Sequence, residues 1–116
     1  MRAIKRRWRL YASPTGDKPV DAYLDGLTDN DAARVFARMK KIRDEGTSSA
    51  RHLLEDIWEA RVDGHAVTHR ILFTEEGRKG RVLLALVGFA KKTRSTPDSI
   101  LELARWRRDD WRSRGR

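Results

Sequence analysis

Apolar and polar residues alternate at the start of the chain and recur at a longer period further on. In residues 4–12, Trp8 and Leu10 alternate with arginines, and this period of two predicts a β-strand. The next stretch, "SPTGDKP", has the proline and glycine content of a turn. Pro19 suits the first turn of a short helix through "VDAYLDGL", and Gly26 suits its end. The chain therefore begins with a predicted strand, a turn and a short helix.

The clearest helical pattern covers residues 28–46, "TDNDAARVFARMKKIRDEG". Thr28 or Asp29 can cap its start, acidic side chains fill its first turn, and basic side chains fill its last turns. Gly46 is a typical helix end. The apolar positions at helical spacing are Ala32, Val35, Phe36, Met39 and Ile42. With the preceding short helix, this segment predicts a helical hairpin that packs on the core.

Three more strands and a last helix are predicted after the hairpin. Residues 56–62 and 65–74 flank an Asp-Gly pair, which is typical of a tight β-hairpin turn. Residues 81–89 form a nearly continuous apolar run, as expected for a strand at the centre of a sheet. The last helix starts near Pro97. The order β-α-α-β-β-β-α predicts one α+β domain over residues 1–116, with an antiparallel-rich sheet, a helical hairpin on one face and a C-terminal helix.

The composition limits the classes of protein to which the chain can belong. At 116 residues, it is long enough to form one hydrophobic core. It has no cysteine, which excludes disulfides, thiolate metal sites and a cysteine nucleophile. No stretch is long and apolar enough for a signal peptide or a membrane span, so a cytoplasmic protein without membrane contact is expected. The net charge of +9 predicts attraction to nucleic acid or to acidic partners.

Alternation along the predicted strands places two arginines on the same side of the sheet. Trp58 is assigned to the face that the helices cover, so Arg61 and Arg70 are expected on the opposite, uncovered face. Lys91 and Lys92 follow the last strand and complete a predicted cationic pocket. Arginine forks and lysine ammonium groups suit phosphate oxygens. The alternative for each arginine is an ordinary surface ion pair with a neighbouring acid.

The histidines offer fewer possibilities. His69 is expected to fill space in the core or at a sheet edge, and His65 is expected in solvent beside a turn. His52 is expected in a loop, where it can donate or accept a proton. No pair of histidines has the spacing of metal ligands, and no glycine-rich phosphate loop is present. The sequence therefore predicts no metal and no cofactor, and it predicts packing roles for Trp106 and Trp111.

Several motifs in the second half of the chain occur together in a known order. Residues 51–53 stand at a Lys-Pro-Leu loop, residues 58–61 at an aromatic-Glu-Leu-Arg strand, and residues 69–71 at an aromatic-Arg-Ile strand. Residues 89–97 match a Phe-x-Lys-Lys-Thr-x-x-Thr-Pro element before a C-terminal helix, which is the most specific of these motifs. On these grounds the chain resembles the HigB-like toxins of the RelE/ParE superfamily, a group that includes phage-derived relatives. The resemblance implies a RelE-like fold.

The same resemblance implies a toxin of a type II toxin–antitoxin pair. Many members of the superfamily enter the ribosome and cut messenger RNA, so the implied activity is that of a metal-independent endoribonuclease that inhibits translation. The implied partners are the ribosome, messenger RNA and a cognate HigA-like antitoxin with a helix-turn-helix. The residues implied to act in cleavage are Arg61, Arg70, Lys92 and Lys91, and those implied to bind RNA are Arg51, His52, Arg94, Arg105 and Arg108.

The chain departs from the family pattern where a proton carrier is expected. Arg51 replaces a lysine and His52 replaces a proline. Because a guanidinium stays protonated, Arg51 cannot act as a base. Transfer of the proton from the RNA 2′-hydroxyl therefore has no assigned residue, and His52 and His69 are the candidates.

Two other functions stay open at the level of sequence. ParE-like members of the superfamily act on DNA gyrase and do not cut RNA. A non-enzymatic, phage-derived basic protein would bind nucleic acid through phosphate contacts alone, and this binding would fall steeply with salt.

Overall fold

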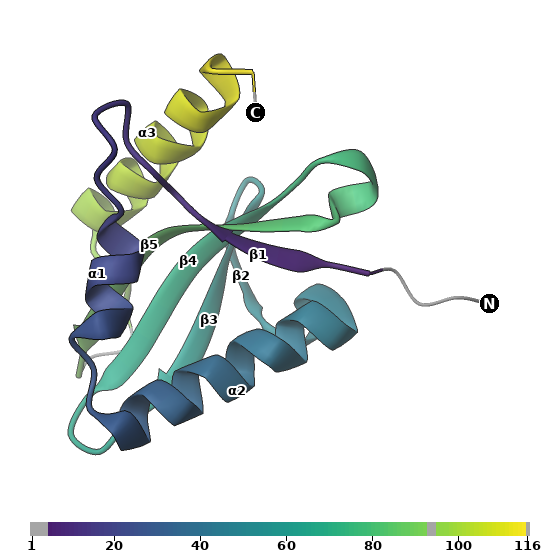
Figure 1. Ribbon diagram of the computed structural model, residues 1–116. Coiled ribbons are helices and arrows are strands. Elements are labelled where there is room, and N and C mark those ends of the chain that lie inside the picture. The colour runs from purple at the N-terminus through teal and green to yellow at the C-terminus, as the bar shows by residue number, and fades with distance from the viewer. Residues whose placement is uncertain (1–4, 93–94, 116) are drawn as a thin grey trace.

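The computed structural model describes residues 5–92 and 95–115, and it contains a five-stranded sheet with helices on both faces (Figure 1). The elements are β1 (Arg7–Leu10), α1 (Pro19–Asp25), α2 (Asp29–Glu45), η1 (Gly46–Ser49), β2 (Arg51–Leu54), β3 (Ile57–Asp63), β4 (Thr68–Glu76), η2 (Arg78–Gly80), β5 (Val82–Lys91) and α3 (Asp98–Ser113). The strand order across the sheet is β1-β5-β4-β3-β2, with β1 parallel to β5 and the other pairs antiparallel. The predicted α+β class is confirmed.

Helices α1 and α2 form the predicted hairpin and cover one face of the sheet (Figure 1). Val35, Met39 and Ile42 of α2 lie in one buried cluster with Ala60 of β3 and Phe73 of β4. Each buried aliphatic side chain of this kind contributes about 2 kcal/mol through loss of apolar contact with water. Burial of the helix stripe therefore fixes the hairpin on the sheet.

Both ends of α2 follow the predicted pattern. The Thr28 hydroxyl accepts a hydrogen bond of 3.2 Å from the backbone N–H of Asp31, which satisfies a donor of the first turn. At the other end, Gly46 adopts a φ of 83°, a left-handed conformation that strains any residue with a side chain. A Cβ at this position would also meet the guanidinium of Arg6.

Helix α3 packs on the opposite face of the sheet, which the sequence analysis expected to be uncovered. Ala104 and Trp111 of α3 belong to one buried cluster with Leu72 of β4 and Leu86 of β5. That expectation was wrong because β4 and β5 are apolar on both faces over most of their length, and both faces need a cover.

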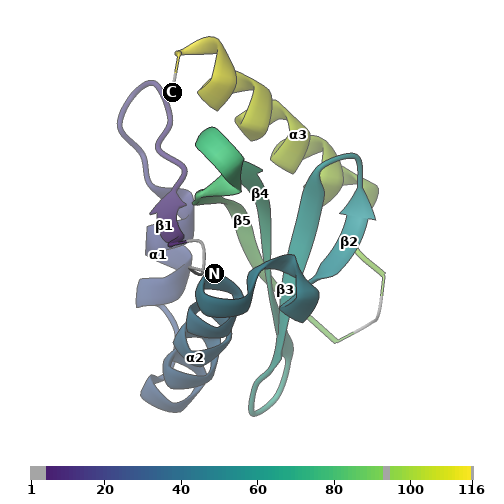
Figure 2. The same cartoon turned by 90° about the vertical axis from the view of Figure 1, so that its right-hand side faces the viewer.

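The short strand β2 is absent from the predicted element order. It pairs antiparallel with the start of β3, at a position where a loop was expected. The turn between the two strands places Glu55 at a φ of 48° and has no glycine or asparagine, so the usual hairpin signal is missing. Figure 2 shows β1 and β2 at the two edges of the sheet.

Some aromatic residues expected in the core lie at the surface. The exposed fraction is 52% for Phe36 and 59% for Trp106, so the packing predicted for these two side chains is wrong. Trp111 is buried as predicted, and Trp8 donates its indole N–H to the carbonyl of Met39 at 2.8 Å. Among the helices that the structure describes, none is long and apolar enough to cross a membrane.

Candidate nucleic-acid interface

Neighbouring strands bring several of the predicted cations close together in the sheet. Arg61 of β3 lies opposite Arg70 of β4, and Arg70 lies opposite Phe89 of β5. Lys91 lies opposite Thr68 and shares a face with Phe89, since the two are separated by one intervening residue of the strand. The fold thus brings together backbone positions that are distant in the sequence.

The side chains of the predicted cations nevertheless have different surroundings. Arg70 is fully buried, with Nη1 3.4 Å from the Glu59 carboxylate. Arg61 is exposed and lines a cavity of about 390 Å³ together with Arg51. Lys92 is exposed and lines a separate cavity beside the β3–β4 turn. The predicted set therefore shares one region of the sheet but not one cavity, and its roles in cleavage stay predictions.

Glu59 is a buried carboxylate that the sequence analysis did not select. Its Oε2 accepts hydrogen bonds from the Thr96 hydroxyl, at 2.9 Å, and from Arg70. Its Oε1 is also buried and has no hydrogen-bond partner in the described part of the chain, and Glu59 lies in the wall of the same cavity as Arg51 and Arg61. Such a carboxylate can accept a proton from a bound ligand. The sequence signal that could have identified Glu59 was its position two residues before Arg61, which places both side chains on the same face of the strand.

A groove runs between α2 and the edge of β3. β2 pairs with residues 57–59 only, so the edge of β3 over residues 60–63 has no strand partner within the described residues. Beside this edge, cavities of about 390 and about 400 Å³ share Arg38 and Lys41 in their linings. We use the term basic groove for this continuous surface, whose basic residues are Arg34, Arg38, Lys41, Arg51 and Arg61.

Within the described residues, the cations of the basic groove lack an acidic partner at ion-pair distance. None of the five forms an ion pair within the described chain. Arg34 donates to the carbonyl of Asp63 at 3.2 Å, and Arg38 donates to the carbonyl of Ser49 at 3.3 Å. The acidic residues of the lining are Glu45, Glu59 and Asp63. Positive charge therefore exceeds negative charge in the groove, and its guanidinium groups keep donors for phosphate oxygens.

The arginines of α3 are in the opposite situation. Arg105 and Arg108, both predicted to bind RNA, form ion pairs with Glu55, and Arg108 also contacts Asp56 at 2.7 Å. Hydrogen bonds from these two arginines hold the pKa of the Glu55 carboxyl below its usual value. Their donors are engaged within the fold, and their role in RNA binding stays a prediction. Arg94, which was also predicted to bind RNA, lies outside the described residues.

His69 lies on the face that α1 and α2 cover, and it is bonded to both helices. Its Nε2 is 2.7 Å from Oδ2 of Asp31, and its Nδ1 is 2.5 Å from the Tyr23 hydroxyl. The hydrogen bond from His69 lowers the pKa of Asp31, so Nε2 donates to a carboxylate and Nδ1 accepts from Tyr23. A Cβ at Gly64 would fall 2.6 Å from Asp31 and 2.8 Å from His69, so only glycine fits there.

The other candidate proton carrier, His52, also points away from the basic groove. Its ring lies edge-on to Trp58, with 5.0 Å between ring centres, and its Nε2 is 2.6 Å from the carbonyl of Glu55. Neither His52 nor His69 lines the cavity that contains Arg51 and Arg61. Of these three residues, only Glu59 lines that cavity, and its side chain is fully buried in the cavity wall.

Comparison with known protein families identifies one family model that matches this chain. Residues 22–109 match the family model described as phage-derived protein Gp49-like (DUF891), and this region includes the whole basic groove. No curated protein matches the chain. Since the family model covers well over half of the sequence, the chain belongs to the phage-derived Gp49-like family, a branch of the RelE/ParE-like toxin superfamily.

Proposed function

We propose that this protein is the toxin of a type II toxin–antitoxin pair and that it acts, like HigB-like toxins, as a ribosome-dependent messenger RNA endonuclease. Membership of a toxin superfamily and the α+β fold support the general class. The observation that carries the specific proposal is the basic groove, in which unpaired cations lie beside a buried carboxylate. RNA is the polyanion that such a groove suits.

Cleavage without a metal needs three contributions from the protein. The RNA 2′-oxygen forms a bond to the adjacent phosphorus, and the bond from phosphorus to the 5′ oxygen breaks, which leaves a 2′,3′-cyclic phosphate and a 5′-hydroxyl. Glu59 Oε1 accepts the 2′-hydroxyl proton once bound RNA has displaced the side chains that bury this atom, and Arg61 and Arg51 stabilise the charge that develops on the phosphate. An ammonium group, Lys91 or Lys92, donates a proton to the departing oxygen. The cavity that Lys92 lines shares Asp63 with the basic groove, so the proposal requires the RNA strand to extend past Asp63.

Arg70 has a positioning role in this proposal. It is fully buried and bonded to Glu59, so it holds the carboxylate and does not bind the phosphate itself. Thr96 donates to the same Oε2. Oε1 is then the buried atom of Glu59 without a hydrogen bond in the described residues, and a ligand must displace the side chains over it to reach it.

The test compares induced expression of the wild type, Arg61→Ala, Glu59→Gln and a control, Arg78→Ala. Arg78 is exposed on η2 and does not line the basic groove. We expect the wild type and the control to stop growth and shorten messenger RNA, and each groove variant to slow cleavage by roughly 100-fold or more. Growth arrest and cleavage that are unchanged in both groove variants would contradict the assignment.

Inhibition of DNA gyrase, as in ParE-like toxins, is a second candidate. It is favoured by the placement of both candidate histidines outside the groove, because a toxin that only binds its target needs no proton carrier. This function predicts altered plasmid supercoiling with intact messenger RNA. A non-enzymatic nucleic-acid-binding protein would instead leave growth, supercoiling and messenger RNA unchanged.

The proposed antitoxin is a HigA-like protein with a helix-turn-helix. An acidic segment of such a partner would match the unpaired cations of the basic groove. Co-expression with the product of an adjoining small gene should restore growth. An antitoxin complex that leaves this groove open to solvent would count against charge complementarity as the basis of neutralisation.

A further inference from the structure

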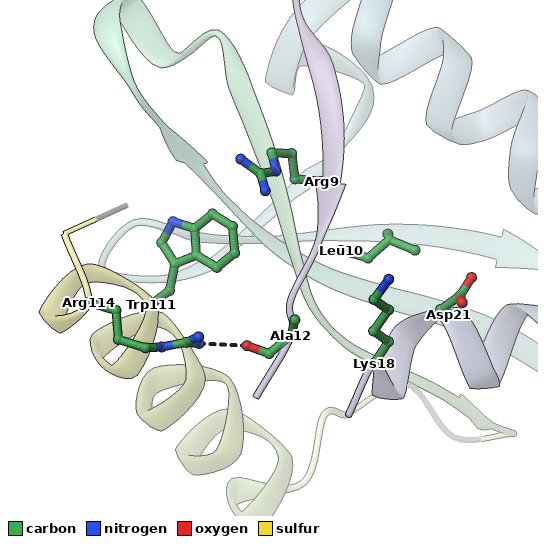
Figure 3. A pocket seen from close by; sticks show the side chains of 7 residues that line it. All are labelled: Arg9, Leu10, Ala12, Lys18, Asp21, Trp111 and Arg114. Atoms are coloured by element: carbon green, nitrogen blue, oxygen red, sulfur yellow. Dashed lines mark hydrogen bonds between the residues drawn. The ribbon is translucent and has the colours of Figure 1, made fainter. Parts of the chain in front are cut away.

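A second cationic cavity, of about 350 Å³, lies at the β1 edge of the sheet (Figure 3). Its walls come from β1 and the residues after it, from the start of α1, and from the end of α3. The lining residues that matter here are Arg9, Ala12, Lys18, Asp21, Trp111 and Arg114. The volume is near the lower limit for small-molecule sites, roughly 300 Å³. A small ligand therefore fits.

The charge of this cavity is positive. Arg9, Lys18 and Arg114 line it, against a single lining acid, Asp21, and Arg114 is itself paired with Asp110 behind the lining. Within the residues that the structure describes, Arg9 and Lys18 take part in no ion pair. Their charges are therefore available to a ligand, in contrast with most arginines of α3.

Two of these cations are held in place before any ligand arrives. The Arg9 guanidinium lies over the Trp111 ring, 5.1 Å from its centre. Arg114 donates to the carbonyl of Ala12 at 2.5 Å and to Asp110 at 2.8 Å, and Figure 3 shows this arginine with Arg9 and Trp111 around the cavity. Fixed donors lose little conformational freedom on binding, so they favour affinity.

This cavity is separate from the basic groove. The groove lies at β2 and the free edge of β3, whereas β1 is at the other end of the strand order. Among the described residues, none lines both the second cavity and the groove. Binding at one place can therefore be removed by substitution without loss of the other.

We propose that the second cavity binds the phosphate of a nucleotide, either as a free nucleotide or as one unit of an RNA strand. Guanidinium forks match phosphate oxygens in pairs, and the mobile ammonium of Lys18 adds a further charge. The Arg9 guanidinium also offers a plane for stacking of a base, as arginine does in many RNA complexes. An acidic peptide has the charge but lacks the base.

The experiment follows the indole N–H signal of Trp111 in ¹⁵N-labelled full-length protein during titration with pyrophosphate, adenosine monophosphate and a short single-stranded RNA. We expect a saturable shift, with affinity about 10-fold weaker in the double variant Arg9→Ala/Lys18→Ala. Asp21→Asn removes the repelling carboxylate from the lining and should tighten binding about 3-fold. The control Arg78→Ala, outside the cavity, should bind like the wild type.

The titration arms identify the source of the phosphate. A Trp111 shift with adenosine monophosphate but not with RNA assigns the cavity to free nucleotides, and a shift with both, lost in the double variant, assigns it to RNA as well. An unchanged Trp111 signal, or equal affinity in the wild type and the double variant, would overturn the inference. So would an acidic peptide that binds as tightly as adenosine monophosphate. The double variant Arg9→Ala/Lys18→Ala leaves the basic groove intact, so we expect it still to stop growth. Failure of the nuclease proposal would instead appear as unchanged messenger RNA in the wild type.

Discussion

Helix α2 presents Arg34, Arg38 and Lys41 to the open edge of β3, whereas α3 turns Arg105 and Arg108 toward the β2–β3 turn. The two helices are similar in length and both are rich in basic residues. On α3 the guanidinium groups meet carboxylates from other elements, and on the groove side of α2 they meet none in the described chain.

The difference separates two uses of positive charge. Arg108 is largely buried and bonded to Glu55, Asp56 and Asp109, so its charge helps to hold α3 against the β2–β3 turn. Such contacts raise the pKa of Arg108 above its ordinary value, although burial opposes the charge. An unpaired guanidinium such as that of Arg38 does little for the fold and remains available to a polyanion.

The largest expected effect is on RNA affinity when the α2 side of the groove loses its charge. The triple variant Arg34→Ala/Arg38→Ala/Lys41→Ala should raise the dissociation constant for single-stranded RNA about 100-fold at low salt. The slope of log affinity against log salt should become shallower by about 2, since each lost phosphate contact contributes about 0.7. Fluorescence anisotropy with labelled RNA over a range of salt concentrations measures both quantities.

The matched control for this measurement is Arg105→Ala on α3. Arg105 is paired with Glu55, so its removal should change RNA affinity by less than about 3-fold and leave the salt slope unchanged. If both variants lose affinity equally, the distinction between paired and unpaired arginines fails.

The next effect concerns the stability of the fold. Arg108→Ala should lower the free energy of unfolding by about 2 kcal/mol, because it removes a largely buried side chain whose packing and donors hold α3 against the β2–β3 turn. Urea denaturation measures the change, and RNA affinity should stay close to the wild-type value. Lys41→Ala, on the exposed side of α2, should change stability by less than about 0.5 kcal/mol. Equal losses in these two variants would contradict the structural role of Arg108.

Local patterns were enough to predict most of the fold. Helix α2 has the apolar stripe and the caps that the sequence predicts, because both depend only on residues close together in the chain. The stripe includes Val35, Met39 and Ile42, and the caps are Thr28 and Gly46. β2 could not be predicted in this way, because four residues with two basic side chains form a strand only when β3 is beside them.

The candidate site was predictable only in part. Strand alternation correctly placed Arg61 and Arg70 in one row of the sheet. It could not tell that one is exposed and the other fully buried against Glu59, because this depends on how α3 and the preceding segment cover the sheet. Nor could it tell which arginines are paired, since Glu55 meets Arg108 across 53 residues of sequence.

The smallest expected effect concerns the hydrogen-bonded chain of Asp31 in α2, His69 in β4 and Tyr23 in α1. Asp31 is buried and holds His69, which in turn accepts a hydrogen bond from Tyr23. Tyr23→Phe should therefore lower the free energy of unfolding at pH 7 by about 1 kcal/mol, because Nδ1 of His69 loses its donor. Thermal or urea unfolding of the two proteins measures this difference.

The same variant should also change the response to alkaline pH. Burial, helped by the charge of Asp31, raises the pKa of Tyr23 to about 12 in the folded protein. The unfolded value is about 10, so the contribution of Tyr23 to stability is complete below pH 10 and is lost as the pH rises to about 12. Wild-type stability should fall through this range more steeply than that of Tyr23→Phe, and Tyr11, which is present in both proteins, cancels in the comparison. Parallel pH profiles would show that Tyr23 is not held as a protonated donor to His69, and the contact between α1 and β4 would then lack this hydrogen bond.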